Sequence, residues 1–443
     1  MIRHVTRSLF VSVLGCFVSQ AAFGIEVPLK YEKYPEQLES FRPIGAARLE
    51  VTKERPAGDW KLPGLTSKQP LYTLTRLGDE KRLLILDRLS ANDPFYNRIY
   101  FDSNGNRDLT DEPAIDGRVQ QASEDVRAVE FPSVDISIKI DRKPVPYSFR
   151  TQAVQFGSAE ELNSGDVENR IGLSLVANCG YGGEFELDGQ TYRVLFGDGN
   201  ANGRFNDRLP IQRDPRTGSC SPSSGESDIV CLTSGKKVAV YDTQPCGDLL
   251  LVSGKLFEVS ISTPEGKLTL TPVTETLAAL KLGMETQHTS IFTEDGQHCV
   301  MMYRPGSEIT IPAGKYRLFG YAVLRKDDQG DLWLLEAEGV PGTPAVTVGE
   351  GIDGVLEFGE PYMPIAQVPP WERDNVKSGV TEVHLMLAIQ GKGNERLLEV
   401  RRIEGNKTRI PLSSEEPGRP KEPTYKIVKS DGEVVAAGSF EYG

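Results

Sequence analysis

Residues 183–207 read GEFELDGQTYRVLFGDGNANGRFND, and the fold prediction starts from this stretch. Polar and apolar residues largely alternate over 183–187 and again over 191–196, as in β-strands that bury one face. Asp188-Gly189 stands between these two runs and is a favoured hairpin turn. The sequence therefore predicts a β-hairpin that leads directly into a polar loop at 198–207.

A second loop of the same kind occurs earlier in the chain, where residues 102–111 read DSNGNRDLTD after the strand-like run 98–101. Aligned from the first Asp, both loops read Asp-x-Asn-x-Asn, and both continue with an apolar residue at position 8 and Asp at position 10. The apolar residues are Leu109 and Phe205. We expect both to point into the core and to anchor each loop to its sheet.

Oxygen-bearing side chains at alternate positions can curl around a single ion. Calcium prefers six to eight oxygen ligands, and a tight loop also needs residues that tolerate positive φ, such as Gly or Asn. The loops therefore predict structural Ca²⁺. The candidate ligands are Asp102, Asn104, Asn106, Asp108 (by side chain or carbonyl) and Asp111 in the first loop, and Asp198, Asn200, Asn202, Arg204 (by its carbonyl) and Asp207 in the second. Since the first loop carries more aspartates, we expect it to bind more tightly.

On these residues, the loops resemble the Asp-x-Asp-x-Asp-Gly calcium loops of EF-hands, dockerins and related extracellular bacterial repeats. The resemblance covers only the two short stretches. The sixth-position Gly is present at Gly203 but replaced by Arg107, and Pro113 and Leu209 stand where the closing acid at position 12 is expected. No flanking helices are predicted. The wider layout resembles secreted bacterial proteins with strand-following loops, which implies no activity.

Short strand-like runs separated by Gly and Pro turns continue along the chain and predict an all-β, multi-domain fold. The expected organisation is a signal peptide (1–24), an extended lead-in (25–70), a β-rich domain with both loops (71–275), a β-sandwich-like module (276–368) and a C-terminal β module (378–443). Residues 309–318 form a strand, a Pro-Ala-Gly turn and a second strand. That phrase resembles the turn of bacterial immunoglobulin-like and prealbumin-like modules.

The N-terminus has the pattern of a secretory signal, with a basic start, an apolar stretch and small residues up to Gly24. Val13-Leu14-Gly15-Cys16 also resembles a lipoprotein box, so a lipid anchor at Cys16 is an alternative. We therefore expect a secreted or periplasmic protein. No stretch is long enough to predict a membrane span, and a net charge of −13 argues against nucleic-acid binding.

Five cysteines follow Cys16, and an exported protein can use such residues in disulfides. Cys220 and Cys231 bracket a Ser/Gly/Pro-rich segment and are the candidate pair. No Cys-x-x-Cys occurs, and we expect His288 and His298 to be ordinary strand residues rather than metal ligands.

The chain has no Gly-x-Ser-x-Gly, His-Glu-x-x-His or phosphate-binding glycine loop. We therefore expect a structural, adhesive or ligand-binding role, with calcium and an envelope protein or cell-surface polymer as partners. A carbohydrate-active hydrolase that uses paired carboxylates, with calcium purely structural, is the alternative. Tyr181 and Tyr192 could line a carbohydrate surface or form a cross-strand core pair.

Overall fold

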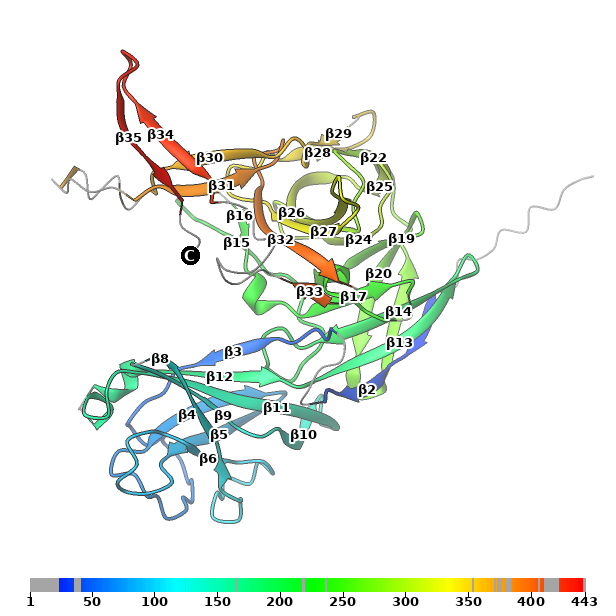
Figure 1. Ribbon diagram of the computed structural model, residues 1–443. Coiled ribbons are helices and arrows are strands. Elements are labelled where there is room, and N and C mark those ends of the chain that lie inside the picture. Colours follow the sequence, from blue (N-terminus) through cyan, green and yellow to red (C-terminus); the bar gives the residue numbers. More distant parts are fainter. Residues whose placement is uncertain are drawn as a thin grey trace, which may run out of the picture.

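The computed structural model describes residues 24–440 except 36–40, 124, 164–165, 217–219, 236, 353, 370–371, 373–376, 379–383, 405–406 and 410–421. The prediction of an all-β fold is confirmed, because strands dominate the described residues (Figure 1). The helical segments with defined bounds are short 3₁₀ turns: η1 (Glu161–Asn163), η2 (Val167–Arg170), η3 (Ser224–Glu226), η4 (Val240–Asp242) and η5 (Thr263–Glu265).

The predicted hairpin is formed by β13 (Cys179–Leu187) and β14 (Gln190–Gly197). Asp188 and Gly189 both have positive φ, 53° and 77°, as a two-residue turn of this kind requires. The hairpin belongs to a five-stranded sheet whose order is β18 (Thr243–Pro245), β17 (Ile229–Thr233), β14, β13 and β2 (Lys30–Lys33). The second loop leaves this sheet at the end of β14.

The first loop leaves a different sheet. Its strands are, in order, β4 (Leu71–Leu77), β5 (Glu80–Asp87), β6 (Arg98–Phe101) and β7 (Ile115–Asp116), and the loop connects β6 to β7. Beside it is a six-stranded sheet with the order β3 (Ala46–Leu49), β12 (Ile171–Ala177), β11 (Lys143–Phe156), β9 (Val126–Glu130) and β8 (Arg118–Ser123), in which β10 (Val134–Ile140) pairs with β11. One hydrophobic core joins these sheets, since it contains Phe101, Phe149, Leu173 and Phe196.

The largest sheet crosses the boundary that the sequence predicted at 275/276. Its order is β1 (Ile25–Pro28), β21 (Lys267–Pro272), β20 (Lys255–Ser262), β19 (Leu249–Val252), β24 (Cys299–Tyr303), β23 (His288–Thr293), β26 (Gly314–Lys326), β27 (Leu332–Glu338), β32 (Arg396–Glu404), β31 (Met386–Gln390) and β30 (Met363–Gln367), with β28 (Val346–Val348) on β26 and β33 (Lys407–Arg409) on β32. The parallel pairing of β19 with β24 makes this connection. The strands of the predicted lead-in also belong to the sheets described above, because β1, β2 and β3 pair with β21, β13 and β12.

A second core lies between the largest sheet and a three-stranded sheet of β25 (Glu308–Pro312), β22 (Leu277–Leu282) and β29 (Gly354–Leu356). Leu280 and Ile311 from the small sheet share this core with Val300 and Leu318 from the large one. The Pro312-Ala313-Gly314 turn carries the chain from one sheet to the other, since β25 and β26 belong to different sheets. The two sheets are thus packed face to face, as in a sandwich.

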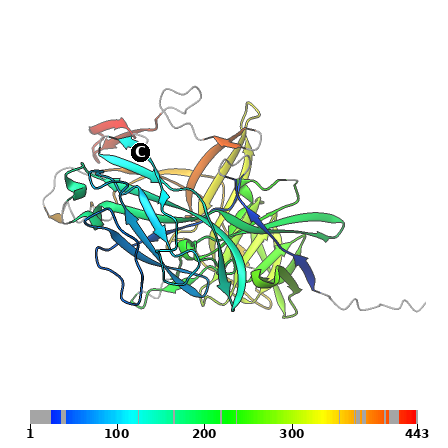
Figure 2. The same ribbon diagram turned by 90° about the horizontal axis from the view of Figure 1, so that it is seen from below.

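Two further hairpins complete the described structure: β15 (Ile211–Arg213) with β16 (Cys220–Pro222), and β34 (Thr424–Val428) with β35 (Val434–Ser439). The second projects from the upper edge in Figure 1. Figure 1 places β4, β5 and β6 at the bottom of the view and β22, β25 and β28 at the top, and Figure 2 shows the same molecule from below. The first acidic loop follows β6 and therefore belongs to the lower part of Figure 1.

The expected disulfide between Cys220 and Cys231 is not formed, and the five described cysteines are all buried. Cys220 on β16 donates to the carbonyl of Glu294 at 2.9 Å, whereas Cys231 on β17 packs with Leu195 and lies 3.6 Å from Thr243 Oγ1. The two thiols therefore have separate surroundings.

The predicted signal peptide lies outside the described residues, apart from Gly24, and so does Cys16. Across the part of the chain that the structure describes, no helix is long and apolar enough to cross a membrane.

His288 is buried in the middle of the largest sheet. It stands on β23 opposite Tyr303 and Ala322, its side chain is 8% exposed, and neither ring nitrogen has a hydrogen-bond partner. Burial disfavours the imidazolium and lowers the pKa of His288 from 6.5 to about 3. The folded state therefore keeps this ring neutral.

This burial predicts acid sensitivity. Between pH 6.5 and pH 3 the unfolded chain protonates His288 and the folded chain does not, so stability falls as the pH falls and is fully present above pH 6.5. The expected cost is about 2 kcal/mol between pH 6.5 and pH 5. Urea unfolding of the wild type and of His288→Leu at several pH values measures it. If the difference between the two proteins did not change with pH, the prediction would be contradicted.

Candidate metal centres

The two loops share left-handed backbone at the same two positions despite their different sequences. Position 4 has positive φ in both, 76° at Gly105 and 50° at Ala201, and so does position 6, 65° at Arg107 and 86° at Gly203. Each loop thus has glycine at one of the two left-handed positions and a residue with a side chain at the other. The sequence mismatch at Arg107 therefore does not change the path of the chain.

In the first loop, the candidate ligands form a chain of side-chain to backbone hydrogen bonds. Asp102 Oδ1 accepts from Gly105 N at 2.9 Å, and the Oδ1 atoms of Asn104 and Asn106 each accept from the amide two residues later. The amide nitrogens of both asparagines turn toward Asp111 Oδ2, at 3.3 and 2.8 Å. The side chains of Asn104, Asn106 and Asp111 are thus in contact with one another.

Asp108 does not join this group through its carboxylate. Its Oδ2 lies 2.6 Å from Lys61 Nζ, and its Oδ1 accepts from the hydroxyl of Thr110. The hydrogen bond from Lys61 lowers the pKa of Asp108 to about 2. The Asp108 side chain, one of the two donors that the sequence left open, is therefore engaged by Lys61 and Thr110.

Asp102 occupies the base of the first loop and is fully buried. Its Oδ2 atom has no hydrogen-bond partner, and burial raises its pKa. The guanidinium of Arg82 donates to the carbonyls of Asp102 and Ser103, at 3.1 and 2.9 Å, rather than to the carboxylate. One carboxylate oxygen thus remains unsatisfied inside the protein.

The second loop repeats this arrangement at a more buried place. The amide nitrogens of Asn200 and Asn202 lie 3.2 and 2.6 Å from Asp207 Oδ2. Asp198 is fully buried, and its Oδ2 accepts from Gly203 N at 2.6 Å and from the hydroxyl of Tyr147 at 2.8 Å. The guanidinium of Arg204 points away to Asp79, so the part of Arg204 available to the loop is its backbone.

Sequence reasoning missed the acid that braces each loop from outside the shared motif. Glu112 Oε1 accepts from the amides of Ser103 and Asn104 in the first loop. In the second loop, Asp228 Oδ1 accepts from Gly199 N at 3.0 Å and Asp228 Oδ2 from Asp207 N at 2.7 Å. Glu112 directly follows the motif and could have been noticed, but Asp228 lies just before β17, and nothing in the sequence connects it to the loop.

Asp207 and the buried Asp198 and Asp228 all accept hydrogen bonds from residues of the second loop. Burial raises the pKa of Asp198 to about 7, although hydrogen bonds from Tyr147 and Gly203 oppose the shift. The pKa of Asp228, which is also fully buried, is raised by burial and by the charges of Asp198 and Asp207. A cation placed among these carboxylates would relieve their repulsion.

The oxygen atoms at each loop are of the types that bind calcium. Within the described residues, no three His, Cys, Asp or Glu side chains gather as metal ligands do. The oxygens available at each loop are aspartate carboxylates, asparagine side chains and backbone carbonyls, a mixture that calcium accepts. Because the asparagine NH₂ groups donate to Asp111 and Asp207, these amides would have to turn before their oxygens could contact an ion.

Leu109 and Phe205 are buried, as expected. Leu109 packs with Trp60 and Tyr100, and the ring of Phe205 makes an edge contact with Tyr181 at 4.9 Å between centroids. These anchors fix the far end of each loop to its sheet.

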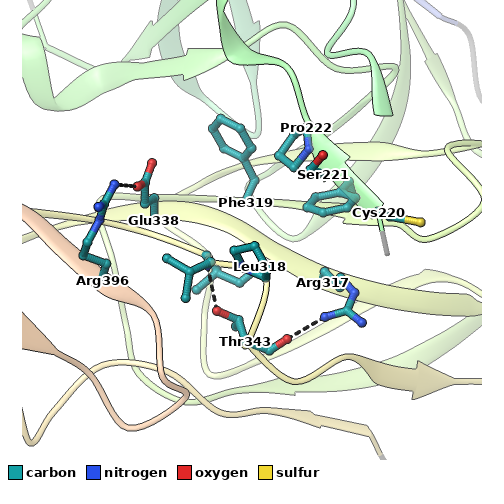
Figure 3. Close-up of a pocket in the computed structure, with 13 residues that line it drawn as sticks. Cys220, Ser221, Pro222, Arg317, Leu318, Phe319, Glu338, Thr343 and Arg396 are labelled. Carbon is teal, nitrogen blue, oxygen red and sulfur yellow. Dashed lines mark hydrogen bonds and ion pairs between the residues drawn. The ribbon is translucent and has the colours of Figure 1, made fainter. Parts of the chain in front are cut away.

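Tyr181 and Tyr192 do not form an exposed aromatic surface. Tyr181 and Tyr192 are both buried, and they pair with different residues. Figure 3 shows a cavity of about 340 Å³ between β16, β26 and β27, whose one lining carboxylate, Glu338, is ion-paired with Arg396. This cavity therefore lacks the carboxylate pair that glycoside hydrolysis needs.

Comparisons with models of protein families, with curated proteins and with solved structures found no match.

Gly203 lies where the second loop meets the turn between β4 and β5. A Cβ atom there would lie 2.6 Å from Ile138 Cδ1 and 3.0 Å from Gly78 N. Gly189 in the β13–β14 turn also has positive φ, but a Cβ atom there would meet nothing within 4 Å. Both positions would strain an alanine backbone, but only Gly203 would also bring the added Cβ atom too close to its neighbours.

We predict that Gly203→Ala destabilises the protein by about 1–3 kcal/mol more than Gly189→Ala. Both variants carry the cost of a left-handed alanine, about 1–2 kcal/mol, and only Gly203→Ala adds a steric overlap. Chemical denaturation of both variants measures the difference. Equal losses would show that the second loop is not packed against the β4–β5 turn.

Proposed function

We propose that this protein binds calcium at its two acidic loops, and that the ions have a structural role in a secreted or periplasmic protein. The observation that carries the proposal is that each loop begins with a fully buried aspartate, Asp102 or Asp198. Neither carboxylate forms an ion pair with a described residue. A buried carboxylate without a cation is costly, and a bound divalent ion would offset that cost.

The candidate ligands suggest what a bound ion would stabilise. Asp102 and Asp198 stand at the ends of β6 and β14, whereas Asp111 and Asp207 lie at the far ends of the loops. An ion held by both ends would close each loop against its strand. With calcium at ten times the dissociation constant, each site would add about 1.4 kcal/mol to the stability.

The geometry favours the second loop as the tighter site, which reverses the ranking expected from the number of aspartates. In the first loop, the nearly fully buried Arg82 contacts the backbone of Asp102, and Lys61 takes the carboxylate of Asp108. In the second loop, Asp228 adds a buried carboxyl group that the sequence did not reveal. More uncompensated negative charge attracts a divalent cation more strongly.

In this proposal the chain acts by binding, adhesion or envelope assembly outside the cytoplasm. The calcium-closed loops would order the edges of two sheets that share one core. An envelope protein or a cell-surface polymer would be the partner. This part rests on the sequence features of export and on the absence of a recognisable catalytic motif in the sequence.

Calcium should raise the unfolding temperature of the wild type, and a chelator should lower it. We predict that Asp198→Asn removes a larger part of this shift than Asp102→Asn, because the second loop has less compensating positive charge. Differential scanning calorimetry with and without calcium measures the effect.

Asp135→Asn is the matched control, because Asp135 pairs with Lys33 at the surface and is not part of either loop. It should keep the full calcium shift. A wild type whose unfolding temperature does not respond to calcium, and which gives no binding heat in calorimetric titration, would refute the proposed function.

A further inference from the structure

The turn between β4 and β5 lies between the two acidic loops. On one side, Gly78 N donates to the carbonyl of Asn202 at 2.7 Å, and Asp79 Oδ1 lies 2.6 Å from Arg204 Nη2. Both contacts go to the second loop. Asn202 is itself a candidate ligand, so the turn holds the backbone of a residue that would contact the ion.

The other side of the same turn reaches the first loop through Arg82. Glu80 Oε2 accepts from Arg82 Nη2 at 2.7 Å, and Arg82 Nη1 donates to the carbonyls of Asp102 and Ser103. Arg82 is 1% exposed. Asp102 is the first candidate ligand of its loop, so a ligand residue is again held by its backbone carbonyl.

These contacts leave little room for either loop to move by itself. A Cβ atom at Gly105 would lie 2.6 Å from Arg82 Nη1, so the first loop lies directly against the guanidinium. Behind the turn, the carbonyl of Lys139 accepts from Asp79 N at 2.7 Å, and Lys139 Nζ lies 2.9 Å from Glu80 Oε1. Strand β10 therefore supports the turn from a third side.

We propose that the two loops bind calcium cooperatively, and that residues 78–82 transmit the coupling. The inference rests on the proposed calcium function. An ion that orders one loop fixes the carbonyl contacts of that loop with the turn, and the turn then presents the other loop in its closed arrangement. Less ordering of the other loop then remains when the second ion binds, so that ion binds more tightly. By linkage, each ion raises the calcium affinity of the other loop by the same factor.

The test compares the wild type with variants that keep one loop each. Asp102→Asn leaves the second loop, Asp207→Asn leaves the first, and titration calorimetry gives the calcium association constant of each. The product of the two wild-type constants should exceed the product of the single-loop constants about fivefold or more. Asn106→Ala, at an exposed position, also removes a candidate ligand of the first loop. It replaces Asp102→Asn if that variant does not fold.

The same measurements are repeated in an Asp79→Ala background, where the ion pair with Arg204 is lost. The ratio of the product of the two constants to the product of the single-loop constants should then lie within about twofold of one. Glu26→Ala is the matched control. It removes the exposed ion pair with Lys267 in the largest sheet and should leave the ratio unchanged.

Amide hydrogen exchange without calcium gives an independent readout. Asp79→Ala should speed exchange at Gly105 and Asn106 in the first loop, although Asp79 contacts only the second, and Glu26→Ala should not. Unchanged exchange, or wild-type constants equal to the single-loop constants, would overturn the coupling and leave calcium binding intact. A wild type that binds no calcium would overturn both proposals.

Discussion

The arrangement of the two loops depends on a guanidinium group that is buried inside a β-domain. Arg82 has almost no exposed surface, so its Nη1 and Nη2 donors need acceptors within the protein, whereas its Nε has no hydrogen-bond partner. Glu80 supplies one, and the backbone carbonyls of Asp102 and Ser103 supply two more. Because a buried guanidinium without acceptors would be very costly, the first loop and the β4–β5 turn have to keep their positions relative to each other.

The second loop is held by the same turn but balances its charge differently. Its arginine, Arg204, extends outward to Asp79, so the interior keeps two buried carboxylates, Asp198 and Asp228, beside Asp207. Tyr147 and backbone amides are the groups that contact these carboxylates. The two loops thus present different electrostatic environments, and for this reason the proposed calcium affinities are ranked differently by the folded geometry and by a count of aspartates.

Local features of the chain could be predicted because they depend on neighbouring residues. The β13–β14 hairpin follows from alternation and from the turn at Asp188-Gly189, and the burial of Leu109 and Phe205 follows from their place in the motif. The boundary expected near residue 275 is not a break in the largest sheet, because the pairing of β19 with β24 joins segments that are distant in the sequence. The sequence likewise could not show that Cys220 and Cys231 lie in separate surroundings.

The sequence by itself determined the all-β class, the two strand-following loops and their side-chain oxygens, because backbone preference and hydrophobic alternation act over a few residues. Tertiary structure alone decided that Asp228 braces the second loop, that Arg82 lies against the first, and that one turn contacts both. These contacts arise where different sheets meet. Buried polar groups must be satisfied by whatever the fold brings near them, and no local pattern encodes those neighbours.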